Sequence, residues 1–443
     1  FADPFVRAYA VRCLDSLPDY RLRLYLLQLV QALKCEQHHD SALMRFLFVR
    51  GLKSPSEVGY SLFWLLQAEL HVPFVHDRFE LLSTQYLCHS GVFRVELYQS
   101  IYVMKLLESI ASEIKAATCA RDNILRSKLE SALLPDCFQL PLHPNVFYSG
   151  FNVEKCRVMD SAKKPLFLHL EPLKHQSLSA TIFKSGDDLR QDQLTLQILR
   201  VMDDLWKSEG LDLKVTAYAC ASTGDNIGFI QVVDQAATLA KICSDRHKDK
   251  KMQKFAAAKT ALFGKQVFAQ WLHNEDTHLR DEIILNFVAS CAGYSVATFV
   301  LGIGDRHNDN LMLSENGQFL HIDFGHFLGH FKTFMGYQRE TAPFVLTPAM
   351  VHVMGDKFGQ FQALCVQAFQ ILRANSSFLI TLLELATNAG IPELRRDTIT
   401  WLEDALMLDL TDAQAQLRLE TLIQEALKNM TTRINHATHI MAH

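Results

Sequence analysis

Residues 304–310 read GDRHNDN and residues 321–325 read HIDFG, and this pair of motifs is the strongest fold signal in the chain. Asn310 and Asp323 offer an amide oxygen and a carboxylate, which are the hard oxygen ligands that Mg2+ prefers. The stretch between them is long enough for a β-hairpin that would bring both side chains to one ion. Asp305 and His307 precede the hairpin, where either could take a proton from a substrate hydroxyl. The motif pair therefore predicts a metal-dependent group-transfer site.

A second motif lies upstream, where residues 182–192 read IFKSGDDLRQD. Lys184 follows a short apolar run that predicts a strand, so its ammonium group is a candidate point charge for a phosphate. Phosphoryl transfer needs such a cation on the nucleotide phosphates, oxygen ligands for Mg2+, and a group that accepts the hydroxyl proton. The chain offers all three in order. ATP and Mg2+ are therefore the predicted cofactors.

Together these motifs resemble those of the phosphoinositide 3-kinase superfamily. The resemblance implies that Lys184 contacts the phosphates of ATP, and that Asp192 supports an affinity pocket beside Tyr218. It also implies that His326, directly after HIDFG, reaches the γ-phosphate. These roles come from the resemblance and not from the spacing of the residues.

The glycine-rich loop of protein kinases is absent from this sequence. Residues 159–165 read MDSAKKP instead, and they look like the phosphate-binding loop of the superfamily, with Ser161 and Lys163 on phosphate. The resemblance also implies that adenine bonds the backbone of residues 231–233. The side chains or backbone expected around adenine are Ile230, Val232, Val233, Met312 and Ile322.

The apolar pattern divides the chain into four parts. Residues 1–118 show helical spacing throughout and predict a solenoid-like accessory domain, truncated at its N-terminus. Residues 119–150 carry several prolines and predict a linker. Residues 151–234 show short apolar runs, including 213–219, around one helix at 194–206, and residues 235–443 return to the helical pattern. The fold class is α+β: a two-lobed, kinase-like domain with a β-rich N-lobe and a helical C-lobe, preceded by an α-helical domain.

Composition limits the other possibilities. A formal net charge of -4 argues against a nucleic-acid partner, because clustered positive charge supplies most of that affinity. The ten cysteines form no CxxC pair, which fits a reducing, cytoplasmic location. Residues 283–302 are apolar enough for a membrane span, but polar side chains interrupt them and favour a buried helix. The chain starts at Phe1 with no leader, so we expect a fragment of a longer cytoplasmic protein that is recruited peripherally to membranes.

The lipid preference depends on the activation loop, residues 325–343. Class I members of the superfamily use phosphatidylinositol 4,5-bisphosphate and carry two basic clusters here, and this chain keeps Lys332 and Arg339, with His330 as a third candidate. Thr341 stands where a further basic residue is usual. Residues 342–344 and 432–435 look more like class II, which favours phosphatidylinositol or its 4-phosphate. Both subclasses stay open, and a regulatory subunit is expected from the resemblance.

Two rival functions follow from the same residues. A protein kinase of the superfamily would share DRH and HIDFG, but it would not carry this helical domain. A catalytically dead scaffold usually loses one of the essential side chains, and all of them are present here. They are Lys184, Asp305, Asn310 and Asp323. We therefore expect an active lipid kinase.

Overall fold

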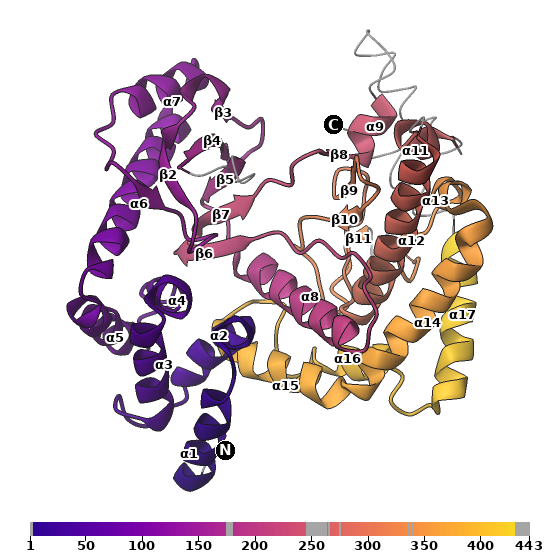
Figure 1. Ribbon diagram of the computed structural model, residues 1–443, viewed down its shortest axis with the longest axis horizontal. Coiled ribbons are helices and arrows are strands. Elements are labelled where there is room, and N and C mark those ends of the chain that lie inside the picture. The colour runs from indigo at the N-terminus through magenta and orange to yellow at the C-terminus, as the bar shows by residue number, and fades with distance from the viewer. Residues whose placement is uncertain are drawn as a thin grey trace. The chain divides into compact units, whose positions relative to one another are not determined.

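The computed structural model describes residues 3–173, 180–244, 264, 266–273, 276–334, 337–338 and 341–429. The chain forms two compact units (Figure 1). The first comprises Phe1–Leu196 with Tyr218–Asp234, and the second comprises Gln197–Ala217 with Gln235–His443. Arg339 lies outside the described residues, so its predicted role stays a prediction.

The first unit begins with amphipathic helices whose apolar faces share a core. Asp3 caps the first helix by accepting the N–H groups of Phe5 and Val6, and Ser41 caps the third. Leu22, Val58 and Phe79 have no exposed surface in this core. The helices are α1 (Pro4–Asp15), α2 (Asp19–Leu33), α3 (Ala42–Lys53), α4 (Tyr60–Gln67), α5 (His76–His89), α6 (Phe93–Ala116), α7 (Arg121–Glu130) and the start of α8 (Arg190–Ser208).

The same unit contains an antiparallel sheet with the strand order β1-β2-β4-β5-β7-β6, and β3 pairs with β4. Phe183 and Phe229 face each other across β5 and β7, with ring centroids 5.0 Å apart. These rings join a core that α6 and α7 also fill. The strands are β1 (Phe138–Gln139), β2 (Phe147–Phe151), β3 (Arg157–Val158), β4 (Leu166–Pro172), β5 (Ala180–Ser185), β6 (Cys220–Gly224) and β7 (Ile227–Gln231).

Two expectations about this region need correction. Residues 119–150 are not an irregular linker, because they contain α7, β1 and most of β2, and Leu125 and Phe138 are buried in the shared core. The run at 213–219 is not a strand either, since the strand starts only at Cys220. Leu213 of this run is buried, and the segment is held by the hydroxyl of Tyr294 on α12 (Thr277–Val300), which donates to the carbonyl of Thr216 at 2.6 Å. Burial of an irregular segment and burial of a strand give the same sequence signal.

The second unit is built around α12 (Thr277–Val300), which packs most extensively against α14. Among the described residues α12 is the one helix long and apolar enough to cross a membrane, but 72% of its most apolar window is buried in the protein. This agrees with the expected core helix. The other helices are α9 (Leu239–Ser244), α11 (Val267–Trp271), α13 (Pro348–Met354), α14 (Phe358–Ala374), α15 (Ser376–Ala386), α16 (Thr400–Ala405) and α17 (Asp412–Lys428).

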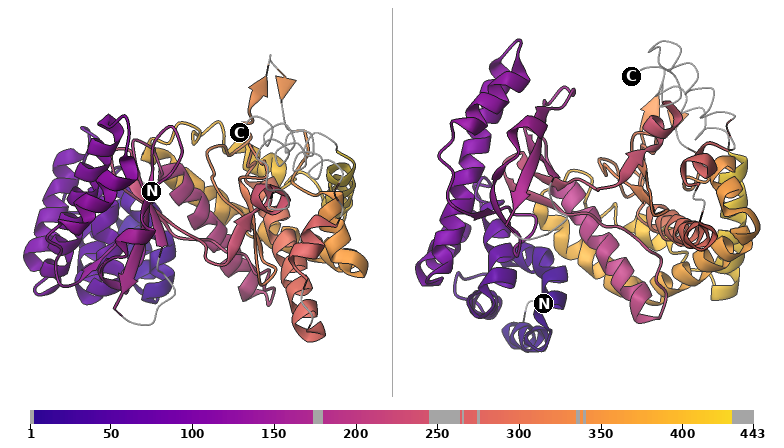
Figure 2. Two further views of the ribbon diagram at one scale, coloured as in Figure 1. Left: turned by 90° about the horizontal axis from the view of Figure 1, so that it is seen from above. Right: turned by 45° about the horizontal axis from the view of Figure 1, so that its top comes forward.

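The predicted hairpin between the two motifs is present in this unit. β9 (Leu311–Ser314) and β10 (Phe319–His321) pair antiparallel, and β8 (Ala236–Thr238) adds to the β9 edge. Gly317 turns the hairpin with φ +91°, and a Cβ there would lie 2.1 Å from the carbonyl oxygen of Ile283. A second ribbon of β11 (Thr333–Phe334) and β12 (Tyr337–Gln338) projects from the activation loop in the left view of Figure 2. The hairpin brings residues 305–310 and 322–326 together.

Candidate active site

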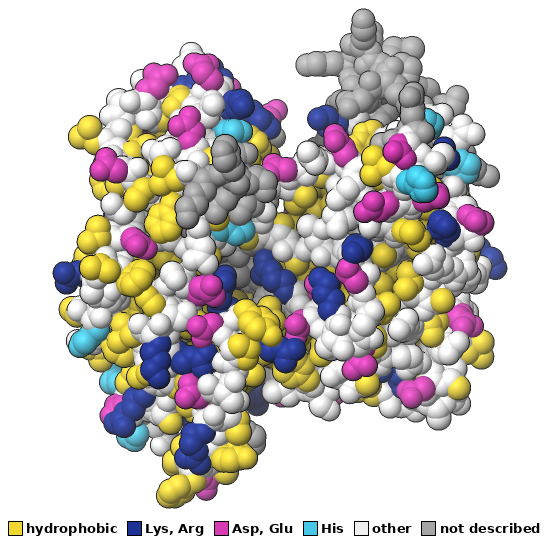
Figure 3. Space-filling model, in the orientation of Figure 1, with side chains coloured by type: hydrophobic (Ala, Val, Ile, Leu, Met, Phe, Trp, Pro, Cys, Tyr) yellow, Lys and Arg dark blue, Asp and Glu magenta, His cyan; other side chains and the backbone are white. Residues whose placement is uncertain are grey.

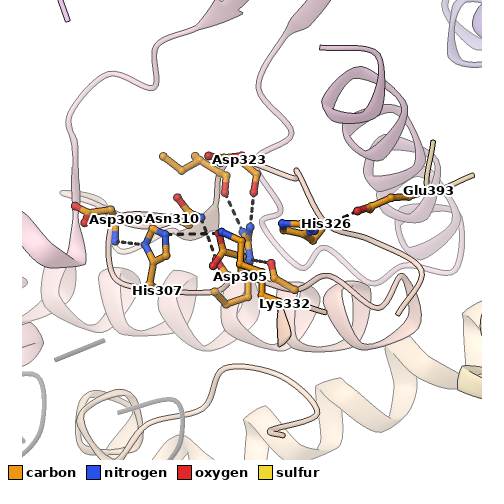
Figure 4. Close-up of polar contacts among 11 residues, drawn as sticks. Asp305, His307, Asp309, Asn310, Asp323, His326, Lys332 and Glu393 are labelled. Carbon is orange, nitrogen blue, oxygen red and sulfur yellow. Dashed lines mark hydrogen bonds and ion pairs between the residues drawn. The ribbon is translucent and has the colours of Figure 1, made fainter. Parts of the chain in front are cut away.

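Residues 302–310 form an irregular loop after α12. Asp305 in this loop and Asp323 after β10, the two candidate aspartates, have unusual backbone angles. Asp305 and Asp323 both lie in the left-handed region, with φ +58° and +59°. Residues other than glycine rarely adopt this conformation, and it persists only where the surroundings enforce it. Figure 4 shows both aspartates in one cluster with Asn310, His307 and Lys332.

Arg306 supplies contacts that hold this backbone, and the sequence motif alone predicted no role for it. Its side chain is buried, with 5% of its surface exposed. The guanidinium donates to the carbonyl of Gly304 at 2.7 Å, to that of Ile322 at 2.9 Å, and to that of Asp323. A buried cation that bonds carbonyls from both motifs fixes the DRH loop against the end of the hairpin. The one feature of the sequence that could have pointed to Arg306 is its position between Asp305 and His307, two predicted catalytic residues.

The candidate metal ligands lie at the open end of the hairpin. Asn310 is buried, and its amide nitrogen donates to the carbonyl of Asp305 at 3.0 Å, so the amide oxygen is the atom left for a cation. The N–H of Ile322 donates to the carbonyl of Asn310 at 3.0 Å, which holds Asp323 next to it, and the Asp323 residue is exposed. One carboxylate and one amide oxygen fit Mg2+, which binds few protein ligands and keeps positions for phosphates and water. No cluster of three His, Cys, Asp or Glu side chains suited to a closed metal cage occurs among the described residues.

Asp305 is paired with a cation from the activation loop. The ammonium group of Lys332 lies 2.6 Å from Oδ2 of Asp305. Burial raises the pKa of the Asp305 carboxyl, but the hydrogen bond and charge of Lys332 outweigh it, so the pKa lies below the ordinary value. Lys332 was expected to face lipid phosphates, whereas in this structure it neutralises the candidate base.

His307 is buried beside Asp305 in a defined orientation. Its Nδ1 accepts the N–H of Asp309 at 3.3 Å, and its Nε2 lies 3.9 Å from Oδ2 of Asp305. An accepting Nδ1 places the proton of a neutral ring on Nε2. The ring therefore presents an N–H group to Asp305.

His326 lies in the loop that follows HIDFG. Its Nδ1 is 3.1 Å from Oε1 of Glu393, which lies between α15 and α16. The hydrogen bond to this carboxylate raises the pKa of His326. Glu393 was not singled out from the sequence, because 67 positions separate the two residues and no motif links them.

The phosphate-facing candidates lie in the first unit. Lys184 is on β5, and its Nζ is 2.8 Å from Oδ2 of Asp187. Opposite it stands Gly228, where a Cβ would lie 2.2 Å from the carbonyl of Ala221, so only glycine allows this close strand pairing. Ser161 and Lys163 are exposed in the turn between β3 and β4.

The remaining nucleotide candidates are distributed over both units. Asp192 and Tyr218 are buried in the first unit, in the first turn of α8 and just before β6. The apolar candidates are half-buried, as expected for side chains that a ligand can still reach. They are Ile230, Val232 and Val233 in the first unit, and Met312 and Ile322 in the second.

Comparisons with known proteins agree with these motifs. Residues 178–396 match the model of the phosphatidylinositol 3- and 4-kinase family, and residues 1–98 match the accessory (PIK) domain of the phosphoinositide 3-kinase family. The chain is 42% identical over 454 residues to phosphatidylinositol 3-kinase 3 of Dictyostelium discoideum, covering 99% of this chain and 26% of that protein. Phosphatidylinositol 3-kinase 2 of the same organism is 40% identical, with 100% and 24% covered. The chain thus spans about a quarter of the length of these relatives. It belongs to the phosphoinositide 3-kinase family and carries the accessory domain and the lipid-kinase domain of that family.

Proposed function

We propose that this chain transfers the γ-phosphate of ATP to the 3-hydroxyl of the inositol ring of phosphoinositides, with phosphatidylinositol 4,5-bisphosphate as the favoured substrate. The observation that carries the proposal is the joining of the two motifs by Arg306, which holds Asp305, Asn310 and Asp323 in one cluster. Family membership supports the lipid-kinase chemistry. Phosphoryl transfer requires mainly positioned charges, and this cluster supplies them.

In this proposal Asn310 and Asp323 hold Mg2+, which neutralises charge on the phosphates when it is bound. Lys184 contacts the ATP phosphates, together with Ser161 and Lys163. Adenine recognition falls mainly to Val233, because the N–H groups of Gln231 and Val232 already donate to Ala219 and Ala180. The N–H of Val233 makes no hydrogen bond in the described part of the chain.

Asp305 is the proposed proton acceptor. The neutral ring of His307 has its proton on Nε2 and no lone pair there, whereas the Asp305 carboxylate keeps lone pairs for a hydroxyl proton. His307 lies beside the carboxylate, with its Nε2 3.9 Å from Oδ2 of Asp305, which is too far for a hydrogen bond. The ion pair between Lys332 and Asp305 has to open for this step. Lys332 would exchange Asp305 for a substrate phosphate as the lipid enters.

A second candidate substrate is phosphatidylinositol or its 4-phosphate, as in class II. The observation in its favour is the residue at 341, where a threonine accepts a hydrogen bond from the side chain of Asn429 at 3.0 Å and contributes no positive charge. Fewer loop cations favour a ring with fewer phosphates.

The proposed location is the cytoplasm, with peripheral recruitment to membranes and a regulatory subunit as partner. On the face shown in Figure 3, Lys and Arg side chains are mixed with Asp and Glu side chains over both units. Mixed charges on that face give weak long-range attraction to anionic lipid there, which is compatible with recruitment by a partner.

The test is a transfer assay with labelled ATP on vesicles of phosphatidylinositol, its 4-phosphate and its 4,5-bisphosphate. The position of the new phosphate is determined on each product. A 3-phosphorylated product made fastest from the bisphosphate is the expected result. Phosphate at another ring position, or no transfer to any of the three lipids, would overturn the proposal. Asp323→Asn serves as the inactive control.

A further inference from the structure

The Glu393 carboxylate makes two hydrogen bonds to the loop that follows HIDFG. Oε1 lies 3.1 Å from Nδ1 of His326, and Oε2 accepts the backbone N–H of Phe327 at 2.9 Å. The two partners, His326 and Phe327, are consecutive residues, and each is bonded to a different oxygen of the Glu393 carboxylate. Figure 4 shows Glu393 reaching the His326 ring from a separate element. One carboxylate therefore fixes both the imidazole ring of His326 and the backbone of Phe327.

The backbone that carries Glu393 is itself anchored. Ile391 and Leu394 are 4% and 2% exposed, so buried apolar side chains hold this segment in the core. The hydroxyl of Thr398 donates to the carbonyl of Glu393 at 2.9 Å and accepts the N–H of Arg395 at 2.9 Å. Glu393 is therefore a fixed support, and His326 is the side chain that it orients.

The contact also selects which ring nitrogen of His326 is offered to a ligand. A carboxylate only accepts hydrogen bonds, so Nδ1 must carry a proton, and Nε2 is the atom left for substrate. We infer that Glu393 is a positioning residue that fixes the ring orientation of His326 and the proton on its Nδ1, so that Nε2 is the atom offered to the transferred phosphate. The inference rests on the proposed function, and it assigns to Glu393 a role at the transfer step.

The charges around His326 strengthen this role. The hydrogen bond and charge of Glu393 raise the pKa of the imidazole above its ordinary value, although burial and Lys332 lower it, and Asp305 adds a smaller increase. The protonated ring offers an N–H donor from Nε2, which bonds a phosphate oxygen more strongly than a neutral donor does. This donor is present at low pH and is lost as pH rises through the pKa of His326.

Glu393→Gln tests the inference, because glutamine keeps the size of the side chain and can still accept the N–H of Phe327. We expect kcat on lipid vesicles to fall about ten- to a hundredfold, by analogy with the loss of a carboxylate that orients a metal-ligating histidine. The KM for ATP should stay within about twofold. The alkaline fall of kcat should move to lower pH. Glu384→Gln, which removes an exposed carboxylate from α15, is the matched control and should behave as the unmodified protein.

A double-mutant cycle separates positioning from simple stabilisation. If Glu393 acts through His326, then Glu393→Gln should lower kcat no further in a His326→Ala background. Equal fold losses in both backgrounds, or an unchanged kcat in Glu393→Gln, would overturn the inference.

A measurement without turnover keeps this inference separate from the proposed function. The ring signals of His326, identified by their loss in His326→Ala, should titrate at lower pH in Glu393→Gln by NMR of histidine-labelled protein. An unchanged titration midpoint and unchanged Nδ1 signal would refute the role of Glu393 even if the protein phosphorylated no lipid. Absence of lipid transfer by the unmodified protein would instead refute the proposed function.

Discussion

Lys332→Ala should reduce turnover on phosphatidylinositol 4,5-bisphosphate more than on phosphatidylinositol. Lys332 is the described cation of the activation loop that was expected to meet ring phosphates, and its side chain is 44% exposed. Plain phosphatidylinositol has no ring phosphate for it to contact. The loss should therefore depend on the number of phosphates on the ring.

The expected size follows from two opposing contributions. A charge-assisted contact to phosphate contributes about 1.5–3 kcal/mol. The lysine must first leave Asp305 at 2.6 Å, and separating such a partly exposed ion pair costs about 0.5–1 kcal/mol. The difference is about 1–2 kcal/mol, which corresponds to about a five- to thirtyfold fall in kcat/KM on the bisphosphate.

The assay compares kcat/KM on vesicles of the three lipids at one surface concentration. Lys53→Ala, which removes an exposed lysine from α3, is the control and should leave all three values unchanged. Equal losses on all three lipids in Lys332→Ala would mean that the lysine serves the loop or Asp305 and not the ring phosphates. That outcome would refute the substrate argument.

Further changes test other parts of the site. Lys332→Ala should also move the acidic fall of kcat/KM to higher pH, because Lys332 lowers the pKa of Asp305 in the free enzyme and its loss lets the carboxylate protonate at higher pH; an acidic limb of kcat/KM that does not move would contradict Asp305 as the proton acceptor. Asp323→Asn should abolish transfer with an unchanged unfolding curve, and more than about a tenth of the normal rate, which is only ~1.4 kcal/mol of barrier, would disprove the metal assignment. Lys184→Met should strongly reduce activity and change the free energy of unfolding by less than about 1 kcal/mol; normal turnover would exclude a phosphate role. Gly329→Ala should destabilise the protein by about 1–3 kcal/mol in urea unfolding, because φ is +79° and the new Cβ would lie 2.4 Å from the ring of Trp401; an unchanged midpoint would show that the loop adapts.

The sequence predicted the local elements of the site well, since each depended on short-range patterns. The hairpin between Asn310 and Asp323, the strand that carries Lys184, and the buried helix before the DRH loop are all confirmed as elements. Family membership and the α+β fold class are confirmed as well. The roles of the individual site residues stay predictions until they are measured.

Other features could not be read from local patterns. The prolines within 119–150 led to the prediction of a linker, so the helix and strands there were missed. Their apolar residues pack into the core shared with α6. The pairing of Lys332 with Asp305 and of Glu393 with His326 joins residues distant in sequence, and either could have faced solvent instead. Charge pairs of this kind become visible only when the chain is folded.

The role of Arg306 shows why the site needs the whole loop and not a set of separate side chains. Asp305 and Asp323 hold backbone conformations that cost free energy, of the order of 1–3 kcal/mol each, and φ is near +60° at both. Arg306 donates to the carbonyl of Asp323 itself and to the carbonyl of Gly304, next to Asp305. A side chain without N–H donors at 306 would leave these carbonyls without their arginine partner. The arginine of the motif therefore holds the backbone at the two aspartates together, which the proposed function requires of them.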